Sequence, residues 1–432
     1  MSLQFITGNS GNGKTKYLFN RIVKEAKANP RDNYLVIVPE QFTMQTQRQL
    51  VDLSENKAIM NIDVLSFKRL AYRVFDELGI TNLTVLEETG KNLVLRKLAA
   101  QEADKLGVIG RNLNRIGYIS EVKSLLSELV QYNISPEELG RYIASGRLSD
   151  TLSDKLKDVL VLYEAFEKFM KDKYITAEEI LNVLSNVAEE SAILRNSVIA
   201  FDEFTGFTPI QNQLIKKLFV ISKKIYVTLT IDCREDIFKS RGMQELFDMP
   251  KRTVKSLTEM AAFYGIEVEE PIILDKNYRL AENEELSFME QQLFRKRRCS
   301  FKKVPKHIHI DCLRDPKQEL TKIARRINEL VRNENLRYRD IAIVTGDVNI
   351  YAGYVREIFD KYNIPYFIDA TQEILFHPFI EFIRSIPDIA AQNFSADAVF
   401  RFLRCGFSEL LDSEIDCLLY TSDAADDRIS VD

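Results

Sequence analysis

The chain has 432 residues, of which 45% are hydrophobic and 28% are charged, and its formal net charge is −5. This length predicts several domains with packed cores, and the small net charge excludes a uniformly basic nucleic-acid-binding protein, so any basic surface must be local. No apolar run is long enough to span a membrane, and no signal peptide precedes the first residues. The 5 scattered cysteines form no C-x-x-C pair, so we expect a soluble cytoplasmic protein without membrane contact.

A glycine-rich motif opens the chain. It matches the phosphate-binding pattern G-x-x-x-x-G-K-[ST], follows a short apolar run and precedes a segment of helical character. Such a loop binds a di- or triphosphate through backbone amides and the start of the next helix, while its lysine reaches the β- and γ-phosphates and its hydroxyl binds Mg²⁺. The alternative is a glycine-rich turn that binds nothing. The predicted ATP-binding residues are Gly8, Asn9, Ser10, Gly11, Asn12, Gly13, Lys14 and Thr15, with Thr15 also the first Mg²⁺ ligand.

The first 86 residues alternate between strand and helix patterns. Residues 34–38 are uninterruptedly apolar, as expected for a parallel strand covered on both faces. Pro39 ends that strand, and Gly79 closes a helix. This alternation predicts a doubly wound α/β fold. The predicted strands are 3–7, 34–38 and 62–65, and the predicted helices are 14–27, one from about 41, and 67–78.

Residues 87–191 have a different pattern, because leucines and aromatic residues recur at helical spacing and strand signals nearly vanish. We therefore predict an all-helical insertion. The α/β alternation returns over 192–293, with strands at 198–201 and 225–231 and a capped helix starting at Thr208. Residues 1–86 and 192–293 are thus predicted to form one lobe.

Two carboxylates, Asp202 and Glu203, directly follow the apolar strand 198–201. A phosphate-binding loop needs an acid for its metal, so we predict that Asp202 holds Mg²⁺ and that Glu203 is the catalytic residue that polarises the attacking water. The alternative is a solvated strand end.

A basic bridge covers residues 294–306. The predicted nucleic-acid contacts are Arg295, Lys296, Arg297 and Arg298, with Phe294 or Phe301 available for base stacking. The alternative is a hydrated linker between two lobes.

Residues 307–419 are predicted to begin a second α/β unit. Its strands are 307–313, 341–345 and 366–368, and its helices are 319–331, 351–362 and 378–391. Residues 420–432 form a polar, acidic tail without apolar periodicity that looks foreign to the fold, so the unit is expected to be truncated.

Taken together, the segments resemble the amino-terminal part of the B subunit of AddAB-type (RexAB-type) ATP-dependent helicase–deoxyribonucleases. The phosphate-binding loop is shared with many ATPases, whereas the Pro-Glu-Gln-Phe-Thr and Phe-Thr-Gly-Phe-Thr-Pro pieces are more specific. The matching segments are residues 8–15, 35–43, 63–71, 201–209, 337–344, 364–369 and 377–379.

The resemblance implies a superfamily-one helicase fold with P-loop (RecA-like) lobes. Lobe 1A is 1–86 plus 192–293, lobe 1B is the helical insertion, and lobe 2A begins at 307. It also implies ATP and Mg²⁺ as cofactors, a heterodimer with the A subunit, and action on double- and single-stranded DNA in the resection of double-strand breaks. A nuclease domain with a [4Fe–4S] cluster belongs to the intact protein only, so Cys405 and Cys417 are not assigned to it.

The chain departs from an active helicase motor at several points. No recognisable adenine-reading glutamine segment precedes the phosphate-binding loop. Residues 227–232 lack the expected Gly-Asp-x-x-Gln, and Thr345-Gly-Asp347 replaces a phosphate-contacting arginine. These departures leave ATP hydrolysis by this chain open. Two alternatives therefore remain: a stand-alone superfamily-one DNA helicase, or a helicase-like scaffold that uses no nucleotide.

Overall fold

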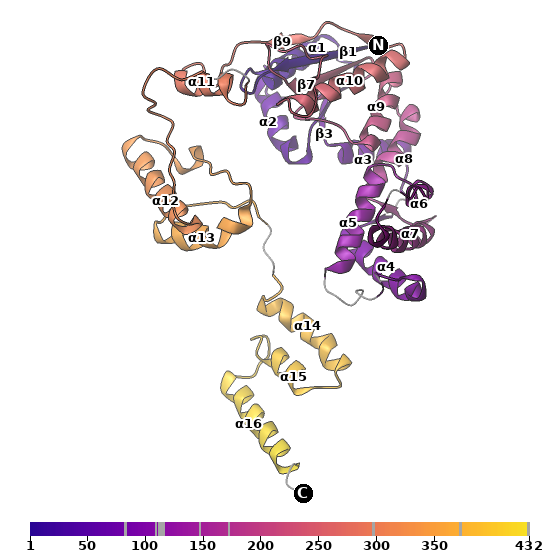
Figure 1. The fold of residues 1–432 in the computed structure, drawn as a ribbon, viewed down its shortest axis with the longest axis vertical. Helices are drawn as coiled ribbons and strands as arrows, with labels where there is room; N and C mark the ends of the chain where they lie inside the picture. The colour runs from indigo at the N-terminus through magenta and orange to yellow at the C-terminus, as the bar shows by residue number, and fades with distance from the viewer. Residues whose placement is uncertain are drawn as a thin grey trace. The chain divides into compact units, whose positions relative to one another are not determined.

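The computed structural model describes residues 1–81, 84–108, 110, 117–146, 148–171, 173–295, 299–370 and 374–429, with side chains as far as residue 420. The chain divides into two compact units, residues 1–308 and 309–432, and each is described by itself (Figure 1).

A parallel sheet is the centre of the first unit. In the described residues it has seven strands in the order β3-β2-β6-β7-β1-β8, and β9 also pairs with β1. Every pairing that the sheet makes is parallel. The central strands are buried on both faces, which explains their uninterrupted apolar sequences. The strands are β1 Ser2–Gly8, β2 Tyr34–Ile37, β3 Ile62–Leu65, β6 Val198–Phe201, β7 Lys224–Thr230, β8 Glu267–Val268 and β9 Ile272–Leu274.

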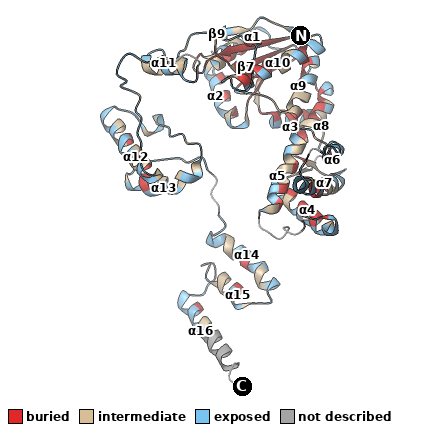
Figure 2. Ribbon diagram, in the orientation of Figure 1, coloured by how far each residue is buried: buried red, intermediate tan, exposed pale blue. Residues whose placement is uncertain are grey.

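Helices cover both faces of this sheet. Successive strand residues point to opposite faces, so Phe5 belongs to one hydrophobic cluster and Ile6 to the other. The cluster around Phe5 includes residues of α3, α8, α9 and α10, and the cluster around Ile6 includes residues of α1 and α2. Figure 2 shows this burial along the strands and the adjoining helix faces. The helices that cover the sheet are α1 Lys14–Ala28, α2 Thr43–Leu53 after the 3-10 turn Glu40–Phe42, α3 Phe67–Leu78, α8 Ile180–Val187, α9 Pro209–Ile221 and α10 Asp248–Phe263. The helix α11 Glu284–Gln292 follows β9, and none of its described residues is buried.

Local sequence signals set several helix ends. Thr208 accepts a hydrogen bond from the backbone of Gln211, whose side chain accepts one from the backbone of Thr208. This capping box confirms the predicted start of α9. Gly79 ends α3 in the left-handed conformation, which a glycine adopts without a steric penalty.

The segment between β3 and β6 contains mostly helices, as its leucine spacing predicts. Its hydrophobic cluster includes Leu95, Leu126, Leu162 and Phe166. One short parallel pair, β4 Val85–Leu86 with β5 Ile175–Thr176, was not predicted. The helices are α4 Glu88–Gln101, α5 Tyr118–Gln131, α6 Pro136–Ala144, α7 Asp150–Met170 and α8 Ile180–Val187, with 3-10 turns at Ala103–Lys105 and Ala188–Glu190.

The second unit contains the predicted helices but not the predicted strands. The predicted strands 307–313, 341–345 and 366–368 pair with no neighbouring strand among the described residues, so these predictions were wrong. Ile310, Val344 and Phe367 are each at least 90% exposed, whereas α12 and α13 pack around Leu320, Ala324 and Phe359. The elements are α12 Pro316–Asn333, the 3-10 turn Tyr338–Asp340, α13 Val348–Lys361, α14 Pro378–Ala391, α15 Ala396–Leu403 and α16 Asp412–Ile429.

Two further predictions concern the acidic tail and the possibility of membrane-spanning helices. The acidic tail, predicted to lie outside the fold, is helical as far as Ile429, because α16 continues through it. None of the described helices has the length and apolar character needed to cross a bilayer.

Candidate functional site

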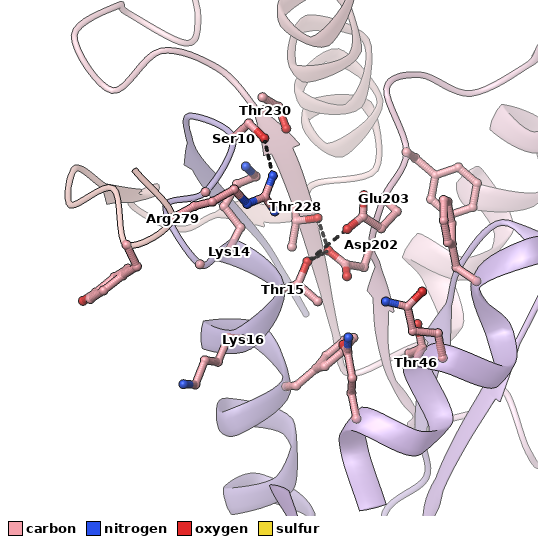
Figure 3. A pocket seen from close by; sticks show the side chains of 18 of the residues that line it. Ser10, Lys14, Thr15, Lys16, Thr46, Asp202, Glu203, Thr228, Thr230 and Arg279 are labelled. Atoms are coloured by element: carbon pink, nitrogen blue, oxygen red, sulfur yellow. Dashed lines mark hydrogen bonds between the residues drawn. The ribbon is translucent and has the colours of Figure 1, made fainter. Parts of the chain in front are cut away.

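The candidate site lies where three strands end. The carboxyl ends of parallel strands share one edge of a sheet, and ligands of open α/β folds bind there. Here β1 leads into the glycine-rich loop, β6 leads into Asp202 and Glu203, and β7 lies between them and carries Thr228. Side chains from all three border a cavity of about 830 Å³ (Figure 3).

The glycine-rich loop adopts backbone conformations that are favourable mainly for glycine. Gly11 and Gly13 have φ angles of +89° and +78°, where side-chain-bearing residues are strained. A Cβ at Gly11 would also lie 2.7 Å from Oδ1 of Asn277. Gly13 immediately precedes α1, so the backbone amides of the loop lie next to the amino-terminal end of that helix, which carries the positive end of its dipole. The two glycines thus permit the wrapped shape that phosphate binding requires.

The side chain of Lys14 folds back onto the loop that precedes it. Its Nζ donates hydrogen bonds to the carbonyl oxygens of Gly8 and Asn9, each at 3.0 Å. Burial lowers the pKa of this ammonium, and the carboxylates of Glu203 and Asp202 oppose that shift. The ammonium is therefore partly desolvated and lies in the cavity, where an anion would gain most from it.

Asp202 is almost fully buried beside the loop, with 1% of its surface exposed. Its Oδ1 accepts hydrogen bonds from Thr228 and from Thr15, the latter at 3.3 Å. Its Oδ2 is buried without a hydrogen-bond partner among the residues that the structure describes. Burial raises the pKa of this carboxyl to about 6; the Thr228 hydroxyl opposes the shift and Glu203 adds to it.

Thr15 and Glu203 complete the acidic side of the cavity. The Thr15 hydroxyl lies 3.3 Å from Oε1 of Glu203 as well as from Asp202, as the dashed lines in Figure 3 show. Glu203 has a φ of +65°, an uncommon backbone conformation for a residue other than glycine. Mg²⁺ prefers oxygen ligands. The Thr15 hydroxyl and the Oδ2 of Asp202, which has no partner in the described part of the chain, are therefore suitable ligands for this ion. The structure thus brings together the lysine, the hydroxyl and both acids that the sequence predicted.

Sequence reasoning missed a third group of site residues, Asn277, Tyr278 and Arg279. Asn277 donates to the carbonyl of Ser10 at 2.9 Å, and the backbone of Tyr278 donates to the carbonyl of Gly11 at 3.0 Å. Arg279 lines the cavity and donates to the Ser10 hydroxyl at 3.4 Å. These residues reach the loop because β9, which precedes them, pairs with β1 and ends at the same edge, a pairing that the sequence alone did not predict.

Comparison with known proteins now gives the family. Residues 5–290 match the family model described as "ADDB, N-terminal". The chain belongs to the AddB amino-terminal family. Its relatives include proteins named as the B subunit of an ATP-dependent helicase/deoxyribonuclease, which are similar to it over nearly its whole length. That of Lachnoclostridium phytofermentans is 38% identical over 421 residues, covering 96% of this chain and 37% of the relative.

Two other relatives carry the same name. The Clostridium tetani protein is 33% identical over 427 residues, and the Caldanaerobacter subterraneus protein is 34% identical over 421 residues. Each alignment covers 97% of this chain, and 37% and 36% of the respective relatives. The chain therefore spans a little over a third of the length of these relatives.

The basic bridge of this AddB-family chain is only partly described. Lys296, Arg297 and Arg298 lie outside the described residues, so their predicted contact with nucleic acid stays a prediction. Arg295 donates to Oδ2 of Asp232 through Nε at 3.0 Å, and its Nη2 lies 2.8 Å from the same oxygen. Burial works against ionisation of Asp232, but Arg234 and Arg295 outweigh it and hold its pKa at about 2. Arg295 thus has a partner within the fold.

Proposed function

We propose that this chain is the ATP-binding, DNA-handling part of the B subunit of a heterodimeric helicase–deoxyribonuclease. Three relatives bear that name, and a parallel sheet with a phosphate-binding loop and an acid at one edge is the architecture that such a subunit needs. We assign residues 1–86 and 192–293 to lobe 1A of a superfamily-one helicase, 87–191 to lobe 1B, and 307–419 to the start of lobe 2A. Residues 294–306 are the bridge between them.

One observation carries the proposal: the buried Oδ2 of Asp202, unpartnered among the described residues, borders the same cavity as the Lys14 ammonium. A buried carboxylate oxygen without a hydrogen-bond partner costs folding free energy. A metal ion bound to this oxygen would remove that cost, which explains why such an oxygen borders the cavity. The loop residues 8–15 would hold the phosphates of ATP, and Thr15 and Asp202 would hold Mg²⁺. The bound ion would neutralise charge on the phosphates.

Glu203 is the candidate catalytic residue. It lies next to the proposed metal ligand and borders the cavity, where its carboxylate could orient a water molecule toward the terminal phosphate. The sequence at the end of β7 favours a subunit over a stand-alone helicase, because residues 227–232 lack the Gly-Asp-x-x-Gln pattern of an active motor. We therefore propose ATP binding by this chain and leave hydrolysis to the complex.

The remaining parts of the proposal concern the whole protein. The partners would be the A subunit and DNA with double- and single-stranded regions, and the process would be recombinational repair of double-strand breaks in the cytoplasm. The nuclease activity and the [4Fe–4S] cluster would reside in sequence other than the present chain.

Nucleotide binding by the Lys14→Ala chain tests the site. Removing the ammonium eliminates a charge-assisted contact to phosphate, so we expect affinity for Mg²⁺ and a fluorescent ATP analogue to fall on the order of a hundredfold. The control is Lys24→Ala, which removes an exposed lysine from the same helix outside the cavity. Unchanged binding by Lys14→Ala would refute the site, and a parent chain that binds no nucleotide would favour the scaffold alternative.

The salt dependence of DNA binding tests the bridge. Each phosphate contact contributes roughly 0.7–0.9 to the slope of log affinity against log salt. Replacing Lys296, Arg297 and Arg298 together by alanine should therefore reduce that slope by about two. An unchanged slope would mean that these three residues do not contact phosphates and that the bridge is a linker.

A further inference from the structure

Asn9, inside the phosphate-binding loop, is bonded to two other parts of the first unit. Its side-chain Oδ1 accepts from the backbone N–H of Cys233, just after β7, at 2.9 Å. Its Nδ2 donates to Oε1 of Glu290, on α11, at 2.6 Å. Its carbonyl oxygen accepts from Lys14. One buried residue thus connects the site lysine, the end of β7 and α11.

The chemistry of these partners fixes the orientation of the Asn9 amide. A backbone N–H can only donate and a carboxylate can only accept, so the oxygen must face Cys233 and the nitrogen must face Glu290. A charged acceptor also strengthens the bond to Nδ2. Glu290 therefore holds the second residue of the loop in a single arrangement.

The chain around Glu290 also makes polar contacts with the residues that follow β7. Arg234 donates to the carbonyl of Gln291 at 3.3 Å. Three residues beyond α11, Arg295 pairs with Asp232, and its guanidinium lies 5.1 Å from the centre of the Phe247 ring. The segment 290–295 is thus held at three points, through Asn9, Arg234 and Asp232.

We propose that Glu290 is a positioning residue that sets the phosphate-binding loop through Asn9, and that α11 responds to nucleotide at the loop. The proposal rests on the proposed nucleotide function. A phosphate that draws the Lys14 ammonium away takes a donor from the carbonyls of Gly8 and Asn9. The Asn9 peptide is then free to adjust, and its side chain passes the change to Glu290. Residues 293–308 follow α11 within the first unit, so this contact connects the site to the stretch that leads out of the unit.

A double-mutant cycle on nucleotide affinity tests the proposal. The full chain is prepared as parent, Glu290→Ala, Asn9→Ala and the double variant, and each is titrated with Mg²⁺ and a fluorescent ATP analogue. If Glu290 acts through Asn9, Glu290→Ala weakens binding on the order of tenfold in the parent and has no further effect in Asn9→Ala. Glu290→Gln, which keeps an acceptor for Nδ2, should restore most of the affinity. Glu282→Ala, an exposed acid just before α11, is the matched control.

The outcomes distinguish the positioning role from nucleotide binding itself. Equal losses from Glu290→Ala in both backgrounds, or no loss in the parent, would overturn the positioning role while leaving nucleotide binding intact. A parent that binds no analogue would overturn the proposed function and this inference with it. Hydrogen exchange of residues 284–295 gives a second measurement. Saturating nucleotide should change the exchange rates there in the parent but not in Asn9→Ala; an equal change in both, or no change in the parent, would contradict the transmission.

Discussion

Asp202 and Asp232 follow neighbouring strands at the same edge of the sheet, and both are almost completely buried, yet their surroundings are opposite. Asp202 has hydroxyl donors on one oxygen and, within the described part of the chain, no partner on the other, and its pKa is raised to about 6. Asp232 meets two guanidinium groups, and its pKa is held at about 2.

The difference shows how partners decide what a buried carboxylate does. An acid neutralised by two arginines has no charge left for a ligand, so Asp232 fastens α11 and the following chain to the sheet. An acid held only by hydroxyls gains from a cation, so Asp202 is suited to bind one. Exposure alone does not distinguish the two residues.

The largest expected effect is on stability, from breaking the Asp232 cluster. Asp232→Ala leaves Arg295 mostly buried without its partner, and removing one member of such a pair costs about 3 kcal/mol of unfolding free energy. Urea unfolding followed by circular dichroism measures the change. Asp236→Ala, on the same loop but more exposed, should change stability little. Equal effects of the two variants would mean that the cluster does not hold the fold.

The second prediction concerns the pH dependence of Mg²⁺ binding, which should follow the ionisation of Asp202. Folding raises the pKa of Asp202 from 3.8 to about 6, so its neutral form favours the folded chain below pH 4, and that stabilisation is lost as pH rises through 6. Mg²⁺ needs the ionised form, so Mg²⁺-dependent nucleotide affinity should fall by up to about tenfold per pH unit below 6.

The reference for this titration is Asp202→Asn, because phosphate groups themselves take up a proton near pH 6. The variant should bind more weakly at pH 8 and show a flatter profile. It should also make the ligand-free chain more stable than the parent at pH 8, on the order of 1–3 kcal/mol, since no buried charge forms. Identical profiles for parent and variant would remove Asp202 from the metal site.

Arg279 should have an intermediate effect. It lines the cavity and bonds to Ser10 of the loop, so its guanidinium can reach an anion held there. We expect Arg279→Ala to weaken binding of the ATP analogue about tenfold. Arg252→Ala, which breaks an ion pair with Asp248 on α10, serves as the control and should bind like the parent.

The smallest expected effect concerns the influence of Glu203 on its neighbour. Its negative charge contributes to the raised pKa of Asp202. Glu203→Gln should therefore move the midpoint of the affinity profile to lower pH by a fraction of a unit, with little change in affinity at pH 8. A midpoint that moves upward would show that the electrostatics of the pair are misassigned.

The sequence predicted which loop and which acid lie together at this edge of the sheet, because each signal is local: a loop with its lysine over residues 8–15, and an acid directly after the strand 198–201. It did not predict the pairing of Asp232 with Arg295, since two residues 63 positions apart meet only through tertiary structure. Tyr278 and Arg279 were missed for the same reason: their place beside the loop depends on β9 joining β1.

The fold shows the same division between local and distant information. Helix 14–28 and helix 378–391 were predicted almost to the residue, because their hydrogen bonds and caps lie within a short stretch. The strand predictions for 34–38 and 198–201 succeeded because these strands pair with each other. Those for 341–345 and 366–368 failed because an apolar stretch becomes a strand only beside a partner, and the described residues supply none.

A structure of the full chain with Mg²⁺ and a non-hydrolysable ATP analogue would show whether the glycine-rich loop binds nucleotide. We expect the terminal phosphates to lie in the loop at residues 8–15 and the ion to lie between Thr15 and Asp202. Lys14 should have exchanged the carbonyls of Gly8 and Asn9 for phosphate oxygens. An analogue bound elsewhere, or Lys14 still bonded to those carbonyls beside a bound analogue, would contradict nucleotide binding as proposed.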